Sequence, residues 1–362
     1  MTAILRVDPC SPEPEKIARA AEVLRAGGLV AFPTETVYGL GADALSAAAV
    51  RRIFEVKGRP ANDPIIVHIS REGELEVVAG EVPPEARELI RRFWPGPLTL
   101  VLPKSERVPS LVTAGLPTVG VRMPAHPVAL ALIARAGPVA APSANLFGRP
   151  SPTRAEHVLQ DLGGKIDLVL DGGPTEVGVE STVLDLSNPR RPRILRPGGV
   201  SREALEEVLG PVELAAATTT GAGVEVEGEG ETPAEPLPSP GLLRRHYAPR
   251  AKLLLFDGPE ALPKMVKLLE ELSDRGERVG LLAPEEHLEE VAPAAAAAGA
   301  LLRSLGSLAD LEGMARGLFA TLRALDQEGV SYILVLAPPR REGLGLAIFD
   351  RLYKAAGSVI MS

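Results

Sequence analysis

Apolar segments of strand length alternate with segments that carry apolar residues at helical spacing over the first 212 residues. Ile17, Ala21 and Leu24 fall on one helical face, and Gly27-Gly28 separates that helix from an apolar strand at 29–32. The same pattern predicts strands at 64–69, 98–102, 118–123, 139–142, 168–170, 181–186 and 193–195, and helices at 45–56, 83–94, 127–136 and 202–209. This interleaving predicts an α/β domain built on one twisted sheet, residues 1–212.

Residues 213–240 differ from this pattern because they are rich in Ala, Thr, Gly, Glu and Pro. We interpret this stretch, continued to residue 250, as a linker between two domains. Residues 251–362 predict a smaller, Rossmann-like α/β domain, with strands at 252–256, 279–283 and 332–337 and helices at 259–273, 308–325 and 344–356. The Ala-rich run 291–300 fits a helix and low complexity equally well.

Composition and charge narrow the class of function. Apolar residues make up 45% of the chain and charged residues 24%, which is typical of a globular protein with a sizeable core. The net charge of −8 argues against a broad nucleic-acid surface, and 3% aromatic residues leave few platforms for stacked bases. A local basic groove stays compatible with these numbers.

Other classes of protein are disfavoured by what the pattern lacks. No apolar run reaches the ~18 residues of a membrane span, and the amino terminus has no secretory signal, so we expect a cytoplasmic protein without a membrane partner. Cys10 is the single cysteine and the five histidines are scattered, which predicts no disulfide and no protein-built metal site.

The segment 29–44 is the first candidate for a site. Its apolar strand runs into Thr34, Glu35 and Thr36, and ligands of open α/β sheets bind at such strand ends. We expect Gly39 and Gly41 to lie in a loop and a helix to begin near Asp43, where free N–H groups would attract an anion. An ordinary connection between strand and helix is the alternative.

Cations and hydroxyls follow other predicted strands and loops. Lys57 and Arg59 form a Lys-x-Arg loop that suits an anion, although such pairs are usually solvated surface residues. Ser143 and Asn145 follow a strand, where they either bind phosphate or close a turn. Arg122 ends an apolar strand and requires a partner, for which a carboxylate is the best match.

Three further segments extend this set. His68 lies inside a predicted strand, where a core role and a site role are equally plausible. Ser181 and Thr182 add hydroxyls at the start of a strand, and Arg196 adds a cation before a turn.

A glycine-rich match to the dinucleotide fingerprint is misleading. Gly39 to Ala44 has the spacing GxGxxA, and Asp63 follows about twenty residues later. Six residues separate the strand from the first glycine, however, and Asp63 precedes its strand. We therefore expect no dinucleotide site, and no Walker A sequence is present.

Seven blocks in the same order resemble the YrdC-type threonylcarbamoyl-adenylate synthases: Phe32-Pro-Thr-Glu-Thr-Val-Tyr-Gly-Leu-Gly41, Lys57-Gly-Arg-Pro60, Trp94-Pro-Gly-Pro-Leu-Thr99, Gly120-Val-Arg-Met-Pro124, Pro142-Ser-Ala-Asn145, Glu180-Ser-Thr-Val183 and Arg196-Pro-Gly198. The resemblance continues through Ser239-Pro-Gly241, His246-Tyr-Ala-Pro249 and Asp350-Arg-Leu-Tyr-Lys-Ala-Ala356. It implies the long, two-domain form, with a YrdC-like twisted mixed sheet. Pro142 departs from the family, in which Thr is common at this position.

The resemblance implies a reaction that joins L-threonine, bicarbonate or carbon dioxide, and ATP into threonylcarbamoyl-AMP and pyrophosphate. Downstream tRNA threonylcarbamoyl-transferase proteins would then modify adenosine beside the anticodon, and a weak tRNA contact is compatible with this role. Magnesium is expected with ATP, held largely by phosphate and water. The alternative function is a non-catalytic RNA-binding or ribosome-maturation protein that shares the fold.

The resemblance also assigns roles to residues. Lys57 and Arg59 are the expected catalytic cations. The expected threonine pocket contains Thr34, Thr36, His68, Arg122, Pro142 and Thr182. The expected ATP site contains Lys57, Arg59, Asn62, Thr118, Ser143, Asn145, Ser181, Arg196, His246 and Tyr247. The linker 213–250 would then end in an active-site lid. We expect this lid, Pro238 to Arg250, to fold over the nucleotide with Arg244, Arg245, His246 and Tyr247.

Overall fold

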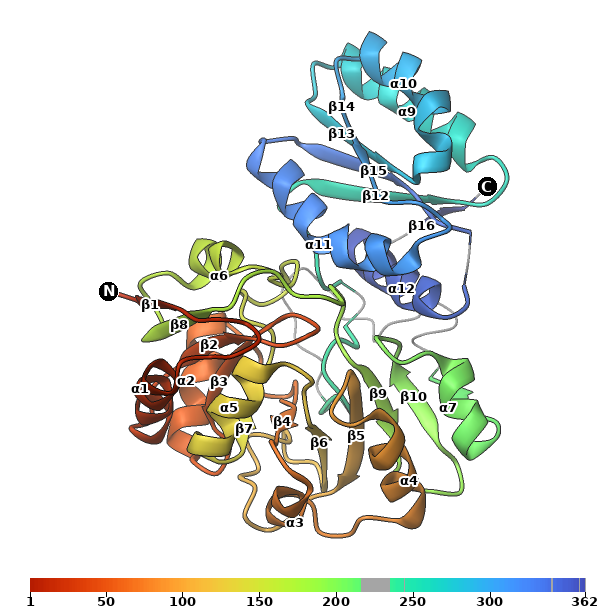
Figure 1. Cartoon of the computed structure of the whole chain (residues 1–362). Helices are drawn as coiled ribbons and strands as arrows, with labels where there is room; N and C mark the ends of the chain where they lie inside the picture. Colours follow the sequence, from red (N-terminus) through yellow and green to blue (C-terminus); the bar gives the residue numbers. More distant parts are fainter. Residues whose placement is uncertain (216–234, 244, 340, 358, 362) are drawn as a thin grey trace. The chain divides into compact units, whose positions relative to one another are not determined.

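The computed structural model describes residues 1–215, 235–243, 245–339, 341–357 and 359–361. They form two compact units (Figure 1), of which the first contains 1–147 and 151–242 and the second contains 148–150 and 243–362. The predicted domain limits at 212 and 250 stay a prediction, because most of the linker lies outside the described residues.

The first unit is built on a mixed sheet with the strand order β1-β8-β2-β3-β7-β4-β6-β5-β9-β10-β11. Its strands are β1 (Ala3–Arg6), β2 (Val30–Pro33), β3 (Tyr38–Asp43), β4 (Val67–His68), β5 (Leu98–Pro103), β6 (Thr118–Arg122), β7 (Val139–Ala140), β8 (Leu168–Asp171), β9 (Thr182–Asp185), β10 (Arg193–Arg196) and β11 (Glu213–Leu214). Its helices are α1 (Pro14–Arg25), α2 (Ala47–Lys57), α3 (Leu75–Val78), α4 (Pro84–Phe93), α5 (Pro127–Ala136), α6 (Ala155–Leu162) and α7 (Arg202–Leu209), with a 3₁₀ turn at Glu72–Glu74.

Two apolar cores lie on opposite faces of this sheet. Successive side chains of a strand point to opposite faces, and in β2 Ala31 belongs to one core while Val30 and Phe32 belong to the other. Helices α1 and α5 cover the second face, and α2, α4 and α6 contribute to the first. The sheet is therefore buried on both faces. The polar side chains of interest lie at the ends of its strands.

The prediction for residues 34–44 was wrong in its secondary structure. Strands β2 and β3 form an antiparallel hairpin, so Gly39 and Gly41 lie within a strand and not in a loop. A Cβ on Gly41 would come within 2.8 Å of both Phe32 and Val139, so close packing explains that glycine. Helix α2 begins after Ser46, whose side chain accepts from the Ala49 N–H, and not near Asp43. Residues 34–37 consequently form the tip of a hairpin.

The second unit contains a parallel sheet with the order β14-β13-β15-β12-β16. Its strands are β12 (Lys252–Asp257), β13 (Val279–Ala283), β14 (Leu301–Ser304), β15 (Tyr332–Leu336) and β16 (Val359–Met361). Its helices are α9 (Ala261–Asp274), α10 (Leu288–Ala297), α11 (Leu311–Gln327) and α12 (Leu344–Ala356), with a 3₁₀ turn at Glu285–His287. Helices α9 and α10 cover one face of the sheet, and α11 and α12 cover the other (Figure 1).

The predicted fold class, a mixed α/β sheet with a second, smaller α/β domain, is confirmed. The Ala-rich run is helical in α10. The predicted strand at 64–69 is reduced to the two residues of β4. Before β4, the Ile65 N–H donates to the Val112 carbonyl, which lies in a loop and not in a neighbouring strand. Within the described ranges, no helix has both the length and the apolarity needed to cross a membrane.

Candidate active site

The tip of the β2–β3 hairpin is a buried turn held by threonine hydroxyls. Thr34 Oγ1 donates to the Val37 carbonyl over 2.7 Å, so the 2.8 Å bond between Thr34 and Thr36 has Thr36 as its donor. Thr36 Oγ1 then accepts from Arg122 Nη1 at 2.9 Å. The turn therefore presents fixed hydroxyl oxygens beside Glu35, which follows Thr34 in the chain.

Arg122 ends β6 and is 4% exposed. Besides Thr36, its guanidinium donates from Nε to the Gly96 carbonyl over 3.2 Å, and its Nη2 lies 2.7 Å from Glu35 Oε1. The expected carboxylate partner of Arg122 is thus supplied, in this structure, by the chain itself. Glu35 was absent from the predicted set, although its place between two site threonines is a usable signal.

His68 lies next to Arg122 in the β4–β6 register. Burial, reinforced by the positive charge of Arg122, lowers the pKa of His68 to about 3. The imidazole is therefore neutral at physiological pH, and it can contribute hydrogen bonds and shape to a pocket without adding charge.

Three predicted phosphate ligands surround one buried carboxylate. Asp63 is fully buried, and its Oδ1 lies 3.0 Å from Arg59 Nη2. Burial raises the pKa of Asp63, whereas the positive charges of Arg59, Lys57 and Arg196 act in the opposite direction. The cations come from α2, from the loop after it and from the end of β10, so the fold gathers charges that are far apart in sequence. Asp63, dismissed in the dinucleotide match, is the second residue that sequence reasoning missed.

The loop after β7 is braced by Lys57. The ammonium donates to the carbonyls of Ser143 and Asn145 at 2.6 and 2.5 Å. Ser143 also forms a bridge with Gly39 of β3, and the carbonyl of Pro142 accepts from the Leu40 N–H at 2.8 Å. Pro142 therefore pairs with β3 through its backbone carbonyl, while its predicted contact with threonine stays a prediction.

The segment before β9 connects Arg196 to the rest of the site. Arg196 donates to the Ser181 carbonyl over 3.0 Å, and Ser181 Oγ shares a 2.8 Å bond with Thr99. The Thr182 hydroxyl donates to the Val200 carbonyl and accepts from the Val200 N–H. The Thr182 side chain can therefore offer a ligand only one oxygen lone pair and its methyl group.

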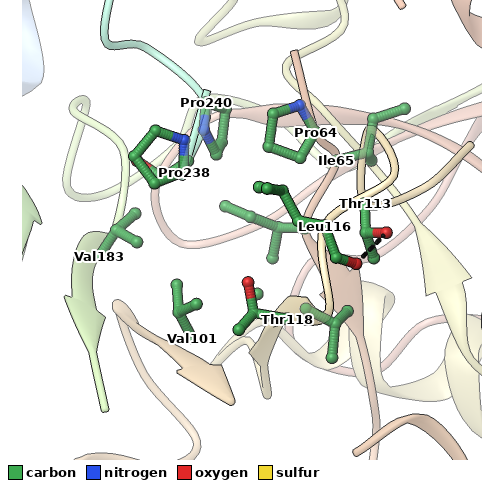
Figure 2. A pocket seen from close by; sticks show the side chains of 13 residues that line it. Pro64, Ile65, Val101, Thr113, Leu116, Thr118, Val183, Pro238 and Pro240 are labelled. Atoms are coloured by element: carbon green, nitrogen blue, oxygen red, sulfur yellow. Dashed lines mark hydrogen bonds between the residues drawn. The ribbon is translucent and has the colours of Figure 1, made fainter. Parts of the chain in front are cut away.

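A small pocket with a volume of about 10 Å³ lies beside this region, and Thr118 is the predicted ATP residue that lines it. Figure 2 shows Pro238 and Pro240 across the cavity from Val101 and Thr118. The segment is tied down by the Leu237 N–H, which donates to the Asn62 carbonyl at 3.0 Å, and by a 3.5 Å bond from Arg196 to the Pro240 carbonyl. The first part of the predicted lid therefore contacts Arg196 through Pro240, and the residue directly before the lid, Leu237, contacts Asn62.

His246 and Tyr247 belong to the second unit. The His246 N–H donates to the Lys354 carbonyl, and the Tyr247 ring packs 5.5 Å from Phe319 and beneath the Arg351 guanidinium. Both side chains are buried within that unit, and their predicted contact with nucleotide stays a prediction. Arg244 lies outside the described residues.

Comparison with known proteins identifies the family. A family model described as "Telomere recombination" matches residues 22–198, and one described as "Threonylcarbamoyl-AMP synthase, C-terminal domain" matches residues 200–357. A threonylcarbamoyl-AMP synthase of Pyrococcus abyssi is 47% identical, over 94% of this chain and 94% of the relative. One of Bacillus subtilis is 46% identical, over 98% and 96% respectively. This chain belongs to the threonylcarbamoyl-AMP synthase family, and it is an enzyme.

Solved structures agree with that family. The crystal structure of P. abyssi Sua5 complexed with L-threonine matches all of this chain at 45% identity and a TM-score of 0.88. A second structure, with a TM-score of 0.87, is of a P. abyssi Sua5 variant in which an adjacent histidine and tyrosine are both replaced by alanine. The family member described here has one His-Tyr dipeptide, His246-Tyr247.

The described residues of this family member do not form a cage for a resident metal ion. Across the described ranges, no three His, Cys, Asp or Glu side chains are grouped so that they could hold a metal. Asp63, the carboxylate within the cation cluster, is surrounded by positive charges that repel a divalent ion. A magnesium ion therefore fits here only together with the phosphates that would carry it.

Proposed function

We propose that this chain condenses L-threonine, bicarbonate or carbon dioxide, and ATP into threonylcarbamoyl-AMP and pyrophosphate. The observation that carries the proposal is the gathering of Lys57, Arg59 and Arg196 around Asp63, in a domain that also holds an arginine site of different character at Arg122. The first is suited to a polyphosphate and the second to an amino-acid carboxylate. The relatives that match the whole chain are named for this product.

The proposed chemistry is nucleotidyl transfer. The carboxylate oxygen of N-carboxythreonine attacks the α-phosphorus of ATP in line, and pyrophosphate leaves. Lys57, Arg59 and Arg196 neutralise the charge that spreads over the phosphoryl oxygens, because cations in a buried site act without water screening. Ser143 and Asn145 orient the nucleotide through the loop that Lys57 braces. None of these side chains has to form a covalent intermediate.

Arg122 and the hairpin tip form the proposed threonine site. Arg122 binds the substrate carboxylate, with Thr34, Thr36, Pro142 and Thr182 as the walls around it and His68 as a neutral neighbour. Thr36 Oγ1 keeps an acceptor lone pair that suits the threonine hydroxyl. Magnesium, when it arrives with ATP, supplies further charge neutralisation on the phosphates.

The lid is proposed to protect the product. Threonylcarbamoyl-AMP is a mixed anhydride that water destroys, so a segment that excludes water is useful. Pro238 and Pro240 line the pocket beside Thr118, the Pro240 carbonyl accepts from Arg196, and the Leu237 N–H, directly before the lid, donates to the Asn62 carbonyl.

The test is incubation of the full chain with L-threonine, bicarbonate, magnesium and ATP labelled in the α-phosphate. Threonylcarbamoyl-AMP and pyrophosphate are expected in equal amounts, and both should vanish when threonine is omitted. Pyrophosphate release that ignores threonine would contradict the proposal. Substituting Arg122→Gln should raise the KM for threonine more than the KM for ATP, which separates the two sites.

The biological role follows from the product. Downstream tRNA threonylcarbamoyl-transferase proteins would transfer the group to adenosine beside the anticodon, which places the chain in the cytoplasm and allows a weak contact with tRNA. A non-catalytic RNA-binding or ribosome-maturation role, the alternative from the sequence, has no support among the curated relatives described above.

A further inference from the structure

The buried ion pair between Glu35 and Arg122 has an incomplete set of hydrogen bonds. Both side chains are about 95% buried, and Glu35 Oε1 lies 2.7 Å from Arg122 Nη2. Within the described part of the chain, however, neither Glu35 oxygen nor Arg122 Nη2 has a partner with hydrogen-bond geometry. Buried charges are costly unless hydrogen bonds complete their surroundings. The pair therefore has unused acceptor and donor capacity on both sides.

An amino-acid zwitterion has the charges that would complete this pair. Its carboxylate would take the Nη2 donors of Arg122, and its ammonium, one carbon away, would reach the Glu35 oxygens. Each charge of the pair would then meet an opposite charge of the substrate. This step rests on the proposed function, which assigns the threonine carboxylate to Arg122.

The reaction also requires a base at this place. An amino group is largely protonated at neutral pH, and it becomes a nucleophile toward the carbon of bicarbonate only after it loses a proton. We propose that the Glu35 carboxylate binds the threonine ammonium and accepts that proton. The free amine then forms the N–C bond to bicarbonate, and hydroxide and a second N–H proton leave together as water. The proton on Glu35 passes to solvent later in the cycle.

The other titratable groups around Glu35 are less suitable as the base. His126, at the start of α5, is near both Glu35 and Glu176, but its Nδ1 accepts the Val128 N–H at 3.2 Å and would lose that bond on protonation. His68 lies beside Arg122, whose charge disfavours a protonated imidazole. The Arg122 guanidinium only donates hydrogen bonds and has no site that accepts a proton. Glu35 is the remaining group that is both in contact with Arg122 and able to accept a proton.

The experiment compares the pH dependence of kcat/KM for threonine in the wild type, Glu35→Gln and Glu35→Asp. Glutamine keeps the size and a hydrogen-bond acceptor but removes the base. We expect Glu35→Gln to lose about 10²-fold or more at neutral pH, the usual range for a general base. Its activity should then recover about tenfold per pH unit toward alkaline pH, because solution supplies the free amine. Glu35→Asp should keep part of the activity and the wild-type pH profile.

A matched control is Glu74→Gln, since Glu74 is also buried in the first unit and accepts from Ser70. It should leave the profile unchanged. A Glu35→Gln enzyme with the wild-type rate at neutral pH would overturn the inference. A loss that does not depend on pH, with weaker folding and an equal effect on the KM for ATP, would also overturn it and assign Glu35 a structural role. Absence of threonine-dependent pyrophosphate from the wild type at every pH would refute the proposed function, and the inference with it.

Discussion

The Lys57 ammonium donates to the backbone carbonyl of Ser143 over 2.6 Å, although 86 residues separate them in the chain. Lys57 stands in the last turn of α2 and Ser143 in the loop that follows β7. The contact places a charge predicted to bind phosphate against a loop predicted to bind the same nucleotide. Two sequence motifs that could each be ordinary surface features are thereby brought into direct contact.

Replacing Lys57 should therefore damage both activity and folding. Lys57→Met keeps the aliphatic stem but leaves the carbonyls of Ser143 and Asn145 without this donor, at a cost of about 1–3 kcal/mol in the free energy of unfolding. Loss of the charge should lower kcat about 10²-fold or more. Pyrophosphate release and urea unfolding measure the two effects. Lys165→Met, which removes an exposed lysine, is the control, and equal activity of the two variants would contradict the assignment.

His68 should make stability depend on pH. Burial and the charge of Arg122 lower its pKa from 6.5 to about 3, so between these values the unfolded chain binds a proton that the folded chain does not. Stability is consequently lost as the pH falls below about 6.5, by about 1.4 kcal/mol per unit.

His68→Gln removes this titration. The difference in unfolding free energy between wild type and variant should shift by about 2 kcal/mol between pH 7 and pH 5, in favour of the variant at the lower pH. Urea unfolding at both pH values measures it. A constant difference would show that His68 titrates normally in the folded protein.

The lid should affect the fate of the product more than the folding of the chain. Pro238→Gly combined with Pro240→Gly loosens the segment over the cavity, because proline restricts the backbone and glycine does not. We expect more AMP for each threonylcarbamoyl-AMP formed, which chromatography of α-labelled products measures. Pro211→Gly, at an exposed position, is the control. An unchanged product ratio would refute the lid.

The double proline substitution is a sharper test of the lid than a deletion of residues 236–250 would be. Leu242, Leu243, His246 and Tyr247 are buried, so the deletion would remove packing from both units together with the lid. A loss of activity after deletion would then have two causes.

Gly198 should not tolerate a side chain. A Cβ there would lie 2.3 Å from the Glu180 carbonyl oxygen and 2.4 Å from the Thr182 nitrogen, both of them backbone atoms that cannot rotate away. Gly198→Ala should displace the segment that holds Arg196 and Ser181, lowering both the Tm and the affinity for ATP. Gly73→Ala is the matched control because nothing lies within 4 Å of the added atom. Thermal unfolding with and without ATP tests the pair.

Much of the fold could be predicted from the sequence alone. Local periodicity placed α12 and β13 at their observed limits, because the apolar pattern and the flanking glycines or charges coincide there. The hairpin of β2 and β3 could not be predicted from that pattern. Gly39 and Gly41 look like loop residues, but both lie in β3. At Gly41, close contacts with Phe32 and with Val139, about a hundred residues away, explain why a strand position holds glycine.

The sequence by itself also determined the family, the candidate cations and the hydroxyl-bearing loops, because these are ordered motifs with characteristic residue types. Only the tertiary structure decided that Glu35 faces Arg122 and that Asp63 lies among Lys57, Arg59 and Arg196. The physical reason is that strand order differs from chain order. The end of β6 meets the turn between β2 and β3, and the ends of β10 and α2 meet around Asp63, through sheet pairing and burial that neither spacing nor composition encodes.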